Sequence, residues 1–433
     1  MSDLLRICTA GSVDDGKSTL IGRLLYDSRG VYEDQIHSVT AASRNRTAGP
    51  IDFSLFTDGL RAEREQGITI DVAYRYFATA RRKFILADTP GHEQYTRNMA
   101  TGASTADLAI LLIDARHGVR EQTRRHARIA ELLGITNLVL AVNKMDLVGY
   151  DRRVFDDIRS AFAEIQGDAR VHAIPMSALK GDNVITTSDS TPWFEGPSLL
   201  EHLETVEIDR NATRRPFRLP VQLVVRPSDD FRGYAGQLCS GVVNVGDSIT
   251  VWPANRSSRV QRIVTWDGDL EQAFAPMSVT LTLEDELDIS RGDVLAIGAT
   301  EVGNRFDADI VWMDERPLDP RRVYLLKHGT TIVSAEVDRA FTLNEIGAAT
   351  VVASRPMVFD SYRADRTTGS FVLIDPATNF TAGAGMIIRR VTEARDGRHR
   401  IGAAGRLAQA ARMAASESEA VDAVRRVLED ILT

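Results

Sequence analysis

The stretch Gly11-Ser-Val-Asp-Asp-Gly-Lys-Ser-Thr19 has the residue types and spacing of a phosphate-binding loop. It follows an apolar run that begins at Leu4 and matches G-x-x-x-x-G-K-[ST], in which backbone N–H groups converge on phosphate oxygens. Lys17 would reach the β- and γ-phosphates as a compact charge, and the Ser18 hydroxyl would bind Mg²⁺. We therefore expect the whole loop to contact a nucleotide: Gly11, Ser12, Val13, Asp14, Asp15, Gly16, Lys17, Ser18 and Thr19.

The base that such a nucleotide carries is indicated by Asn143-Lys-Met-Asp146, directly after the apolar run Leu138–Val142. The Asp146 carboxylate can accept hydrogen bonds from N1–H and the 2-amino group of guanine, whereas adenine would leave it buried and unpaired. Asn143 would bind the N7/O6 edge and brace the loop, while the stem of Lys144 covers the ring beside Met145. A later loop, Ser177, Ala178 and Leu179, would touch the guanine oxygen through its backbone. The sequence predicts GTP.

Hydrolysis requires a sensor of the γ-phosphate and a positioned water. Asp88, Thr89, Pro90, Gly91 and His92 follow the apolar run Phe84–Ala87. Asp88 would hold the Mg²⁺ shell through a water, and the Gly91 N–H would read the γ-phosphate. His92 would orient the attacking water as the catalytic residue, a role that a glutamine has in other GTPases. Thr69, in Gly67-Ile-Thr69, would be the second hydroxyl ligand of Mg²⁺.

The elements that must position these residues alternate along the first half of the chain. Runs of strand length are expected at Leu4–Thr9, Val72–Phe77, Phe84–Ala87, Ala109–Ile113, Leu138–Val142 and Val171–Ile174. Apolar residues at helical spacing are found in Lys17–Tyr26, Glu93–Thr101, Glu121–Leu133 and Arg153–Ile165. This alternation predicts a mainly parallel sheet covered by helices on both faces. The predicted fold class is therefore an α/β P-loop GTPase domain, over residues 1–212.

The second half of the chain has a different texture. Short runs of period two, separated by turn signals, predict one β-barrel over 213–302 and a second over 303–399. The Ala-rich tail, 400–433, is predicted to be helical, with Val421, Val424, Leu428 and Ile431 on one face. Two interpretations of the tail stay open. It either covers its own barrel or remains a flexible linker, or it docks onto a partner protein.

Composition limits the class of protein. The 433 residues include 43% hydrophobic and 26% charged residues, with a net charge of -8. That acidic balance argues against a dedicated nucleic-acid partner. The longest apolar run is too short to span a membrane, and no secretory signal follows Met1, so we expect no membrane association. Neither Cys8 nor Cys239 lies in a metal-binding pattern, and this favours the reduced cytoplasm.

These motifs, followed by two predicted barrels, resemble the elongation factor Tu class of GTPases. One detail differs from the translation factors, whose loop reads G-H-V-D-H-G-K-[ST], because Ser12 and Asp15 stand at the two histidine positions. The loop as it stands resembles the GTPase subunit of bacterial sulfate adenylyltransferase. So do Leu24–Ser28, Thr57–Phe77, Asp114–Gly118, Thr191–Ser198 and Asp288–Asp293. Beyond Glu301 the resemblance rests on barrel texture alone. The two aspartates of the loop add negative charge beside the phosphates and Mg²⁺, which predicts that this loop binds metal differently from its histidine-bearing relatives.

The resemblance implies that GTP hydrolysis drives ATP and sulfate toward adenosine 5′-phosphosulfate and pyrophosphate, a nucleotidyltransferase reaction. The resemblance also implies that adenylyl transfer occurs on a separate, smaller catalytic subunit. The phosphate-loop pattern occurs once in this sequence, so no second nucleotide site is expected here. Some family members continue into a fused adenylylsulfate kinase; since this sequence stops at Thr433, that activity is not expected here, and a separately encoded kinase is a further candidate partner. The alternative is a translation-factor-like GTPase that delivers RNA to the ribosome, since a fold does not fix a function.

Overall fold

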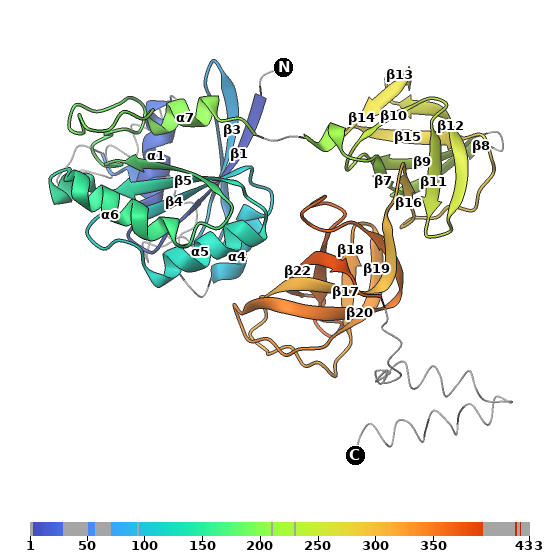
Figure 1. The fold of residues 1–433 in the computed structure, drawn as a ribbon. Helices are drawn as coiled ribbons and strands as arrows, with labels where there is room; N and C mark the ends of the chain where they lie inside the picture. The colour runs from blue at the N-terminus through green and yellow to red at the C-terminus, as the bar shows by residue number, and fades with distance from the viewer. Residues whose placement is uncertain are drawn as a thin grey trace. The chain divides into compact units, whose positions relative to one another are not determined.

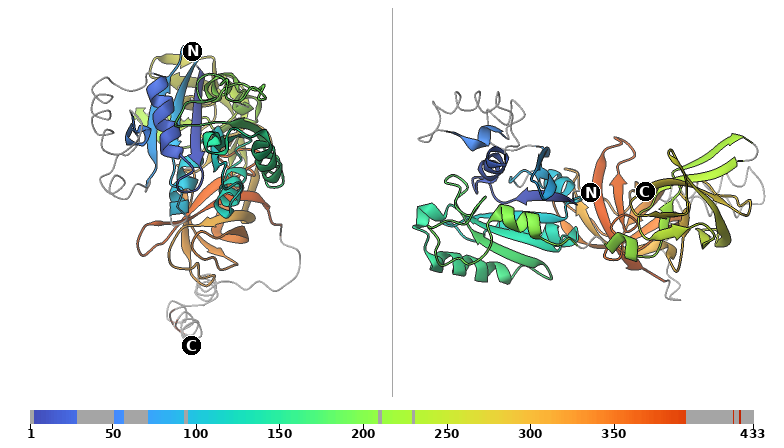
Figure 2. Two further views of the ribbon diagram at one scale, coloured as in Figure 1. Left: turned by 90° about the vertical axis from the view of Figure 1, so that its left-hand side faces the viewer. Right: turned by 90° about the horizontal axis from the view of Figure 1, so that it is seen from above.

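The computed structural model describes residues 3–28, 51–56, 71–92, 95–208, 211–228 and 231–392, together with Val421 and Arg425. The chain divides into two compact units, Met1–Asp209 and Arg210–Thr433 (Figure 1). Figure 2 shows the layered first unit and the strand-rich second unit from two further sides. Among the helices of the described ranges, none has the length and apolar character needed to cross a bilayer.

A six-stranded sheet forms the centre of the first unit. Its strands lie in the order β2 (Ala73–Ala78), β3 (Arg82–Asp88), β1 (Asp3–Ala10), β4 (Leu108–Asp114), β5 (Asn137–Asn143) and β6 (Arg170–Pro175). All neighbours are parallel except β2, which runs antiparallel to β3. The side chains of β4 and β5 are buried throughout, as expected for central strands covered on both faces.

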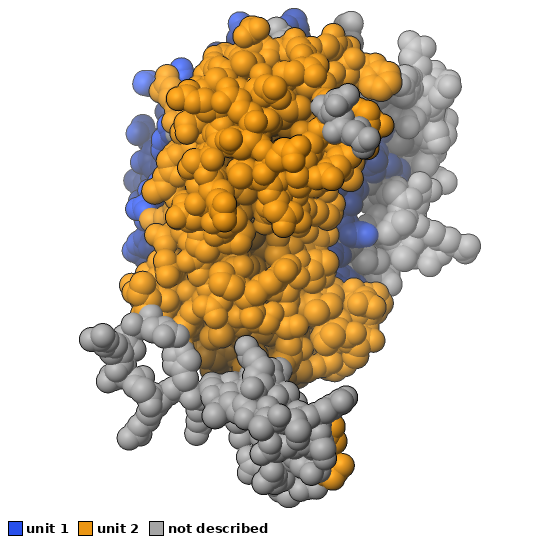
Figure 3. Space-filling model, turned by 90° about the vertical axis from the view of Figure 1, so that its right-hand side faces the viewer, with its two compact units in different colours: residues 1–209 blue, residues 210–433 orange. Residues whose placement is uncertain are grey.

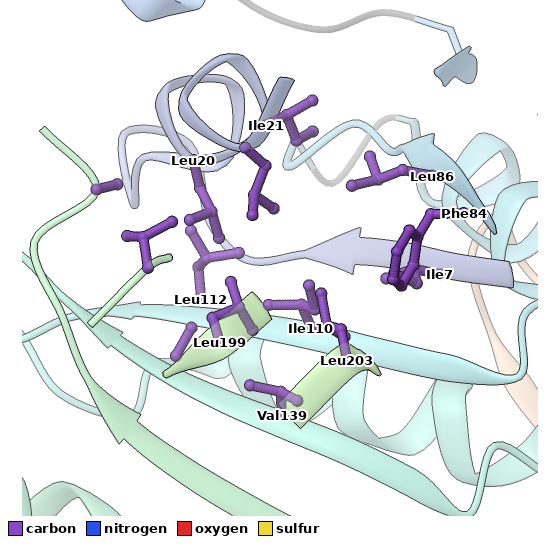
Figure 4. Close-up of a cluster of buried hydrophobic side chains, with 14 of the residues drawn as sticks. Ile7, Leu20, Ile21, Phe84, Leu86, Ile110, Leu112, Val139, Leu199 and Leu203 are labelled. Carbon is purple, nitrogen blue, oxygen red and sulfur yellow. The ribbon is translucent and has the colours of Figure 1, made fainter. Parts of the chain in front are cut away.

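Helices cover both faces of this sheet (Figure 1). They are α1 (Lys17–Asp27), α4 (Thr96–Ala103), α5 (Glu121–Leu132), α6 (Arg152–Ala163) and α7 (Leu199–Thr205), with short 3₁₀ turns at Phe53–Phe56 and Met145–Val148. The side chains of α1 and α7 pack on one face, where Leu20, Leu199 and Leu203 meet Ile7 and Phe84 (Figure 4). This buried cluster therefore joins α1, which follows the phosphate loop, to the sheet and to α7.

The short helix α7 is absent from the elements that we expected from the sequence. Seven residues give too few turns for a clear helical period. The Ser198 side chain caps its first turn by accepting the Glu201 N–H, and Leu199 and Leu203 are fully buried. At its other end the buried Arg82 guanidinium donates to the carbonyls of Leu203 and Val206, both at 2.9 Å. Tertiary contacts therefore hold this helix.

The second unit consists of β-strands in two sets and a 3₁₀ turn at Asn211–Arg214. The first set is β7 (Arg218–Pro220), β8 (Leu223–Ser228), β9 (Phe231–Gln237), β10 (Val242–Asn244), β11 (Ser248–Trp252), β12 (Arg256–Thr265), β13 (Gly268–Leu270), β14 (Gln272–Phe274), β15 (Ser278–Leu283) and β16 (Val294–Ala296). The second set is β17 (Glu301–Trp312), β18 (Tyr324–His328), β19 (Thr331–Val337), β20 (Ile346–Phe359), β21 (Ser370–Ile374) and β22 (Thr381–Arg390), which close into a barrel.

This architecture confirms the predicted fold class, an α/β nucleotide-binding domain followed by β-barrels. The boundaries that we predict at 212, 302 and 399 stay predictions. The predicted tail, 400–433, lies outside the described residues except for Val421 and Arg425, which are helical and exposed.

An ion pair between a buried arginine and a half-buried aspartate joins the two strand sets of the second unit. Arg218 on β7 contacts both oxygens of the Asp360 carboxylate, which follows β20, at 3.1 Å. The same guanidinium donates to the carbonyls of Ile297 and Ala299. Thr330 Oγ1 donates to the Val221 carbonyl at 3.2 Å, which adds a second link. Figure 3 shows the unit that contains both strand sets, residues 210–433, in orange.

Candidate functional site

The phosphate-binding loop connects the end of β1 to the first turn of α1. Gly16 has a φ of 97°, which favours glycine, and a Cβ there would lie 2.4 Å from Asn143 Nδ2. A Cβ on Gly11 would lie 2.8 Å from the Leu112 carbonyl oxygen. Both glycines of the motif are therefore required by backbone shape and close approach. Val13, Ser18 and Thr19 are half-buried, with the last two in the first turn of α1.

Lys17 lies inside this loop with its side chain folded back on it. Its residue is 7% exposed, and Nζ donates to the carbonyls of Gly11 and Ser12 at 2.9 and 2.8 Å. Burial lowers the pKa of Lys17, although the nearby carboxylates of Asp88 and Asp15 oppose that shift. A buried ammonium surrounded by carbonyls is positioned to exchange those oxygens for phosphate oxygens.

The Asp15 carboxylate faces into the protein. It is 3% exposed, and its Oδ2 accepts the Ser12 backbone N–H at 2.7 Å. Burial raises the pKa of Asp15, with the hydrogen bond from Ser12 acting against it. In the structure the Asp15 carboxylate therefore binds the phosphate loop itself, through the Ser12 N–H. Its effect on metal binding stays a prediction. Asp14, with a φ of 68°, is exposed.

Asn143, at the end of β5, ties three segments together. Its Nδ2 donates to the Asp15 carbonyl at 2.8 Å, and its Oδ1 accepts the Ala178 N–H at 2.9 Å. The residue is 2% exposed. Both polar atoms of the side chain therefore brace the phosphate loop against the Ser177–Leu179 loop, in the way that the sequence predicts for a loop brace.

Lys144 and Asp114 form a network that the sequence analysis did not assign. Lys144 Nζ lies 3.0 Å from Asp114 Oδ2 and also donates to the Asp14 carbonyl. Arg116 Nε and Nη2 bind the same carboxylate at 3.0 and 2.7 Å. Burial would raise the pKa of Asp114, but the hydrogen bonds from Arg116 and Lys144 outweigh it and hold the pKa well below its usual range. A carboxylate at the end of a buried strand, followed closely by arginine, is the signal that marks this network in the sequence.

The predicted base-binding residues lie at the adjacent turn. The Asp146 side chain is 9% exposed, and its Oδ2 is 4.0 Å from Lys180 Nζ. Met145 is fully buried, and its N–H donates to the Met176 carbonyl at 3.1 Å, which couples the turn to the Ser177–Leu179 loop. That loop is closed by Gly181 N–H, which donates to the Ser177 carbonyl at 2.7 Å. Met145 thus anchors the turn, while the Asp146 carboxylate remains near the surface.

The segment Asp88–His92 continues from β3 and packs against the phosphate loop. Asp88 is 2% exposed, and Thr89 Oγ1 donates to the Thr9 carbonyl of β1. A Cβ on Gly91 would lie 2.3 Å from Lys17 Nζ and 2.7 Å from the Gly11 carbonyl oxygen. Only glycine therefore fits at this contact. Pro90 is buried as well.

His92 lies at the surface next to this contact. It is exposed, and its ring centroid is 6.0 Å from that of Tyr95. The structure thus brings the phosphate loop, Asp88–Gly91, Asn143–Asp146 and Ser177–Leu179 to the carboxyl edge of one sheet, where ligands bind in parallel α/β folds. Thr69, the predicted second hydroxyl ligand, lies outside the described residues.

Comparison with protein families gives two matches. Residues 2–209 match the elongation factor Tu GTP binding domain, and residues 336–388 match the GTP-eEF1A C-terminal domain-like family. The first match spans the whole of the candidate site.

Several individual proteins are similar over most of this chain. A protein named sulfate adenylyltransferase subunit 1 from Saccharophagus degradans is 52% identical over 89% of this chain and 87% of its own length. The protein of the same name from Shewanella oneidensis is 52% identical over 89% of this chain and 85% of its own length. The bifunctional enzyme NodQ of Rhizobium sp. (strain BR816) is 53% identical over 89% of this chain, which spans 64% of the length of that relative.

Proposed function

This chain belongs to the sulfate adenylyltransferase subunit 1 family, and we propose that it hydrolyses GTP to drive the formation of adenosine 5′-phosphosulfate and pyrophosphate from ATP and sulfate. The observation that carries this proposal is the 52% identity over 87% of the length of a relative with that name. The name favours this function over RNA delivery to the ribosome. The geometry of the site supplies the chemistry.

GTP would bind along the carboxyl edge of the sheet. The N–H groups of residues 11–19 and the dipole of α1 would hold the phosphates, with Lys17 exchanging its two carbonyl partners for phosphate oxygens. Asp146 would accept from the guanine N1–H and 2-amino groups. Since Ala178 N–H is already engaged by Asn143, we assign the contact with the guanine oxygen to the neighbouring backbone of Leu179.

The donor set of this site fits Mg²⁺. Ser18 and Thr69 offer hydroxyl oxygens and Asp88 offers a carboxylate through water, and Mg²⁺ prefers such oxygen ligands and retains several waters. Asp88 is buried next to Lys17, so a second cation here would be balanced by a carboxylate. When bound, Mg²⁺ would neutralise charge on the β- and γ-phosphates.

His92 would act on water at the γ-phosphate. Because the backbone of Gly91 lies so close to Lys17 and to the Gly11 carbonyl that a Cβ would not fit, we expect this segment to move when a γ-phosphate arrives. Its N–H would then report the phosphate, while the imidazole of the next residue orients the attacking water. The Asp88–His92 segment therefore links occupation of the loop to movement of α4.

Coupling is chemically reasonable because adenylylation of sulfate is uphill and a second hydrolysis can drive it. The word "subunit" in the names of the relatives implies a partner chain. We propose that the partner is the smaller catalytic subunit that transfers the adenylyl group, in the cytoplasm, with adenylylsulfate kinase as a further candidate.

The proposal is tested with the complex of this chain and the adenylyl-transferring subunit. Product from ATP and sulfate is measured with GTP, with a non-hydrolysable GTP analogue and without nucleotide. We expect GTP alone to raise the amount of adenosine 5′-phosphosulfate above that reached without GTP. Equal product in all three reactions would refute the coupling.

A further inference from the structure

A hollow of about 240 Å³ lies on one face of the six-stranded sheet, lined from β1, β2, β3 and the end of α4. Its lining includes Arg6, Tyr74, Tyr76, Ile85, Gly102 and Thr105. The strand register places Tyr76 beside Ile85 and Ile85 beside Arg6, so that these side chains share a face. The alternate residues Phe77 and Phe84 belong to the buried core on the opposite face.

The tyrosines of this hollow are unusually exposed for an apolar surface. Tyr76 is 66% exposed and Tyr74 is 42% exposed. Phe77, the β2 residue that points to the opposite face of the sheet, is only 6% exposed. Both tyrosines lie on β2, an edge strand that pairs only with β3 among the described strands. Exposed aromatic side chains gathered at a hollow are typical of protein interfaces, where tyrosine is enriched.

One wall of the hollow contacts the segment that is predicted to read the γ-phosphate. Gly102, at the end of α4, approaches Thr89 and Val72 so closely that a Cβ there would lie 2.8 Å from Thr89 Cγ2 and 3.2 Å from Val72 Cγ1. Thr89 lies within the Asp88–His92 segment, and Val72 follows three residues after Thr69. We expect movement of the Asp88–His92 segment to displace this wall.

The charge at the hollow favours an acidic occupant. Arg6 lines it, and Lys83 lies on the same face because it is paired with Ala78 on one side and with Leu4 on the other. Both cations are exposed. The carboxylate of Asp107, next to the lining residue Ala106, accepts the Arg6 backbone N–H at 3.0 Å and is engaged there.

We propose that this hollow docks the adenylyl-transferring subunit, through a segment of that subunit that presents apolar side chains flanked by carboxylates. The inference rests on the proposed function. It adds the surface through which the partner would respond to the bound nucleotide. A partner that packs against Gly102 and Thr105 binds one position of α4 better than another. By linkage, GTP and GDP then change its affinity, and its binding changes nucleotide turnover in return.

The test uses the full chain with Tyr76→Asp, which places a carboxylate where an acidic segment must dock. The matched control is Trp266→Ala, because Trp266 is 100% exposed and lies in the other unit. Affinity for the adenylyl-transferring subunit is measured by calorimetry with a GTP analogue and with GDP. GTP turnover and thermal unfolding of the isolated chain are measured in parallel.

We expect Tyr76→Asp to weaken partner binding at least tenfold and to abolish the difference between the two nucleotides. Basal turnover and the unfolding temperature should stay at the wild-type values, and Trp266→Ala should match wild type throughout. Partner affinity within twofold of wild type would overturn the proposal. So would a lowered unfolding temperature with unchanged partner affinity, which would assign the hollow to packing within this chain. A second variant, Lys83→Glu, should weaken binding in the same direction.

The wild-type complex separates this inference from the proposed function. If GTP fails to raise product in the wild-type complex, the proposed function is wrong. If GTP raises product equally in the wild-type and Tyr76→Asp complexes, only the docking site is wrong.

Discussion

The lysines of this chain show how single residues are matched to the site. Only five of its 52 basic residues are lysine, and Lys17, Lys144 and Lys180 all lie at the candidate site. Lys17 fits between two carbonyls as a compact ammonium, where the planar fork of arginine would need more space. Arg116, by contrast, donates hydrogen bonds from Nε and Nη2 to the two oxygens of the Asp114 carboxylate, the bidentate geometry that arginine provides.

Replacement of Lys17 by alanine tests the phosphate assignment. The charge that would contact the β- and γ-phosphates is removed, so GTP affinity should fall by about a hundredfold or more. Calorimetry on Lys17→Ala measures this, and Lys327→Ala, at an exposed position on β18, is the control. Unchanged GTP affinity in the Lys17 variant would show that the phosphates bind elsewhere.

Replacement of His92 separates catalysis from binding. The side chain is exposed, and it would act on the attacking water and not on the phosphates. His92→Ala should therefore retain GTP affinity and slow hydrolysis by about two orders of magnitude. Single-turnover hydrolysis measures the effect, with the exposed His117→Ala as control. Weak binding with normal turnover would contradict the role of His92 in positioning water.

At the scale of the elements, periodicity predicted most of the first unit. Each of the six strands was expected within two residues of its observed ends, because the central strands are apolar throughout and β2 alternates. The helix predicted from Glu93 begins at Thr96 in the structure. The motifs were found because their residues are adjacent in sequence. The local part of the Asp114–Arg116–Lys144 network has a sequence signal, but its contact with Lys144 joins separate segments, and no local pattern encodes that contact.

Buried histidines should make the stability of this unit depend on pH. On α5, burial and then the charge of Lys17 lower the pKa of His126 to about 3. The rings of His172 on β6 and His202 on α7 stack 4.3 Å apart, and burial followed by the charge of His172 lowers the pKa of His202 to about 4. In the unfolded chain both would titrate near 6.5.

Since the folded pKa values lie below the unfolded ones, the unfolded state takes up protons first as the pH falls below about 6.5. We expect the free energy of unfolding to decrease between pH 6.5 and pH 5, by on the order of 2 kcal/mol from His126 alone. Denaturant titrations of the full chain at several pH values measure the slope. His202→Gln should reduce it, and the exposed His117→Gln should not. A slope that is the same in all three proteins would contradict this assignment.

At the scale of the whole molecule, the fold class followed from the switch between helical and period-two patterns near residue 212. The contacts that unite the two strand sets could not be predicted from the sequence, because Arg218 and Asp360 are 142 positions apart. Charge and composition say which residues are available for such pairs, but the pairing is decided by tertiary packing.

The tail gives a prediction at this scale. The apolar stripe that the sequence predicts, which includes Val421 at 54% exposure, would need a surface to pack on because a free helix of this length is marginal in water. Truncation after Arg400 distinguishes the two interpretations of the sequence. If the tail docks onto a partner, a pull-down should lose the partner while basal GTP turnover and thermal stability persist. Unchanged partner binding would rule out docking. The remaining interpretation would be that the tail covers its own barrel or is a flexible linker.

The central claim is that GTP hydrolysis on this chain drives sulfate activation, and Asp146→Asn tests it most directly. The side chain keeps its shape but offers an N–H where the carboxylate accepted, so it repels the guanine 2-amino group and matches the carbonyl of xanthine. Formation of adenosine 5′-phosphosulfate by the two-subunit complex is measured with GTP and with xanthosine triphosphate. The Asp146→Asn complex should be driven by xanthosine triphosphate and not by GTP, with the wild type showing the reverse. Product that is still driven by GTP alone in the Asp146→Asn complex would contradict the account.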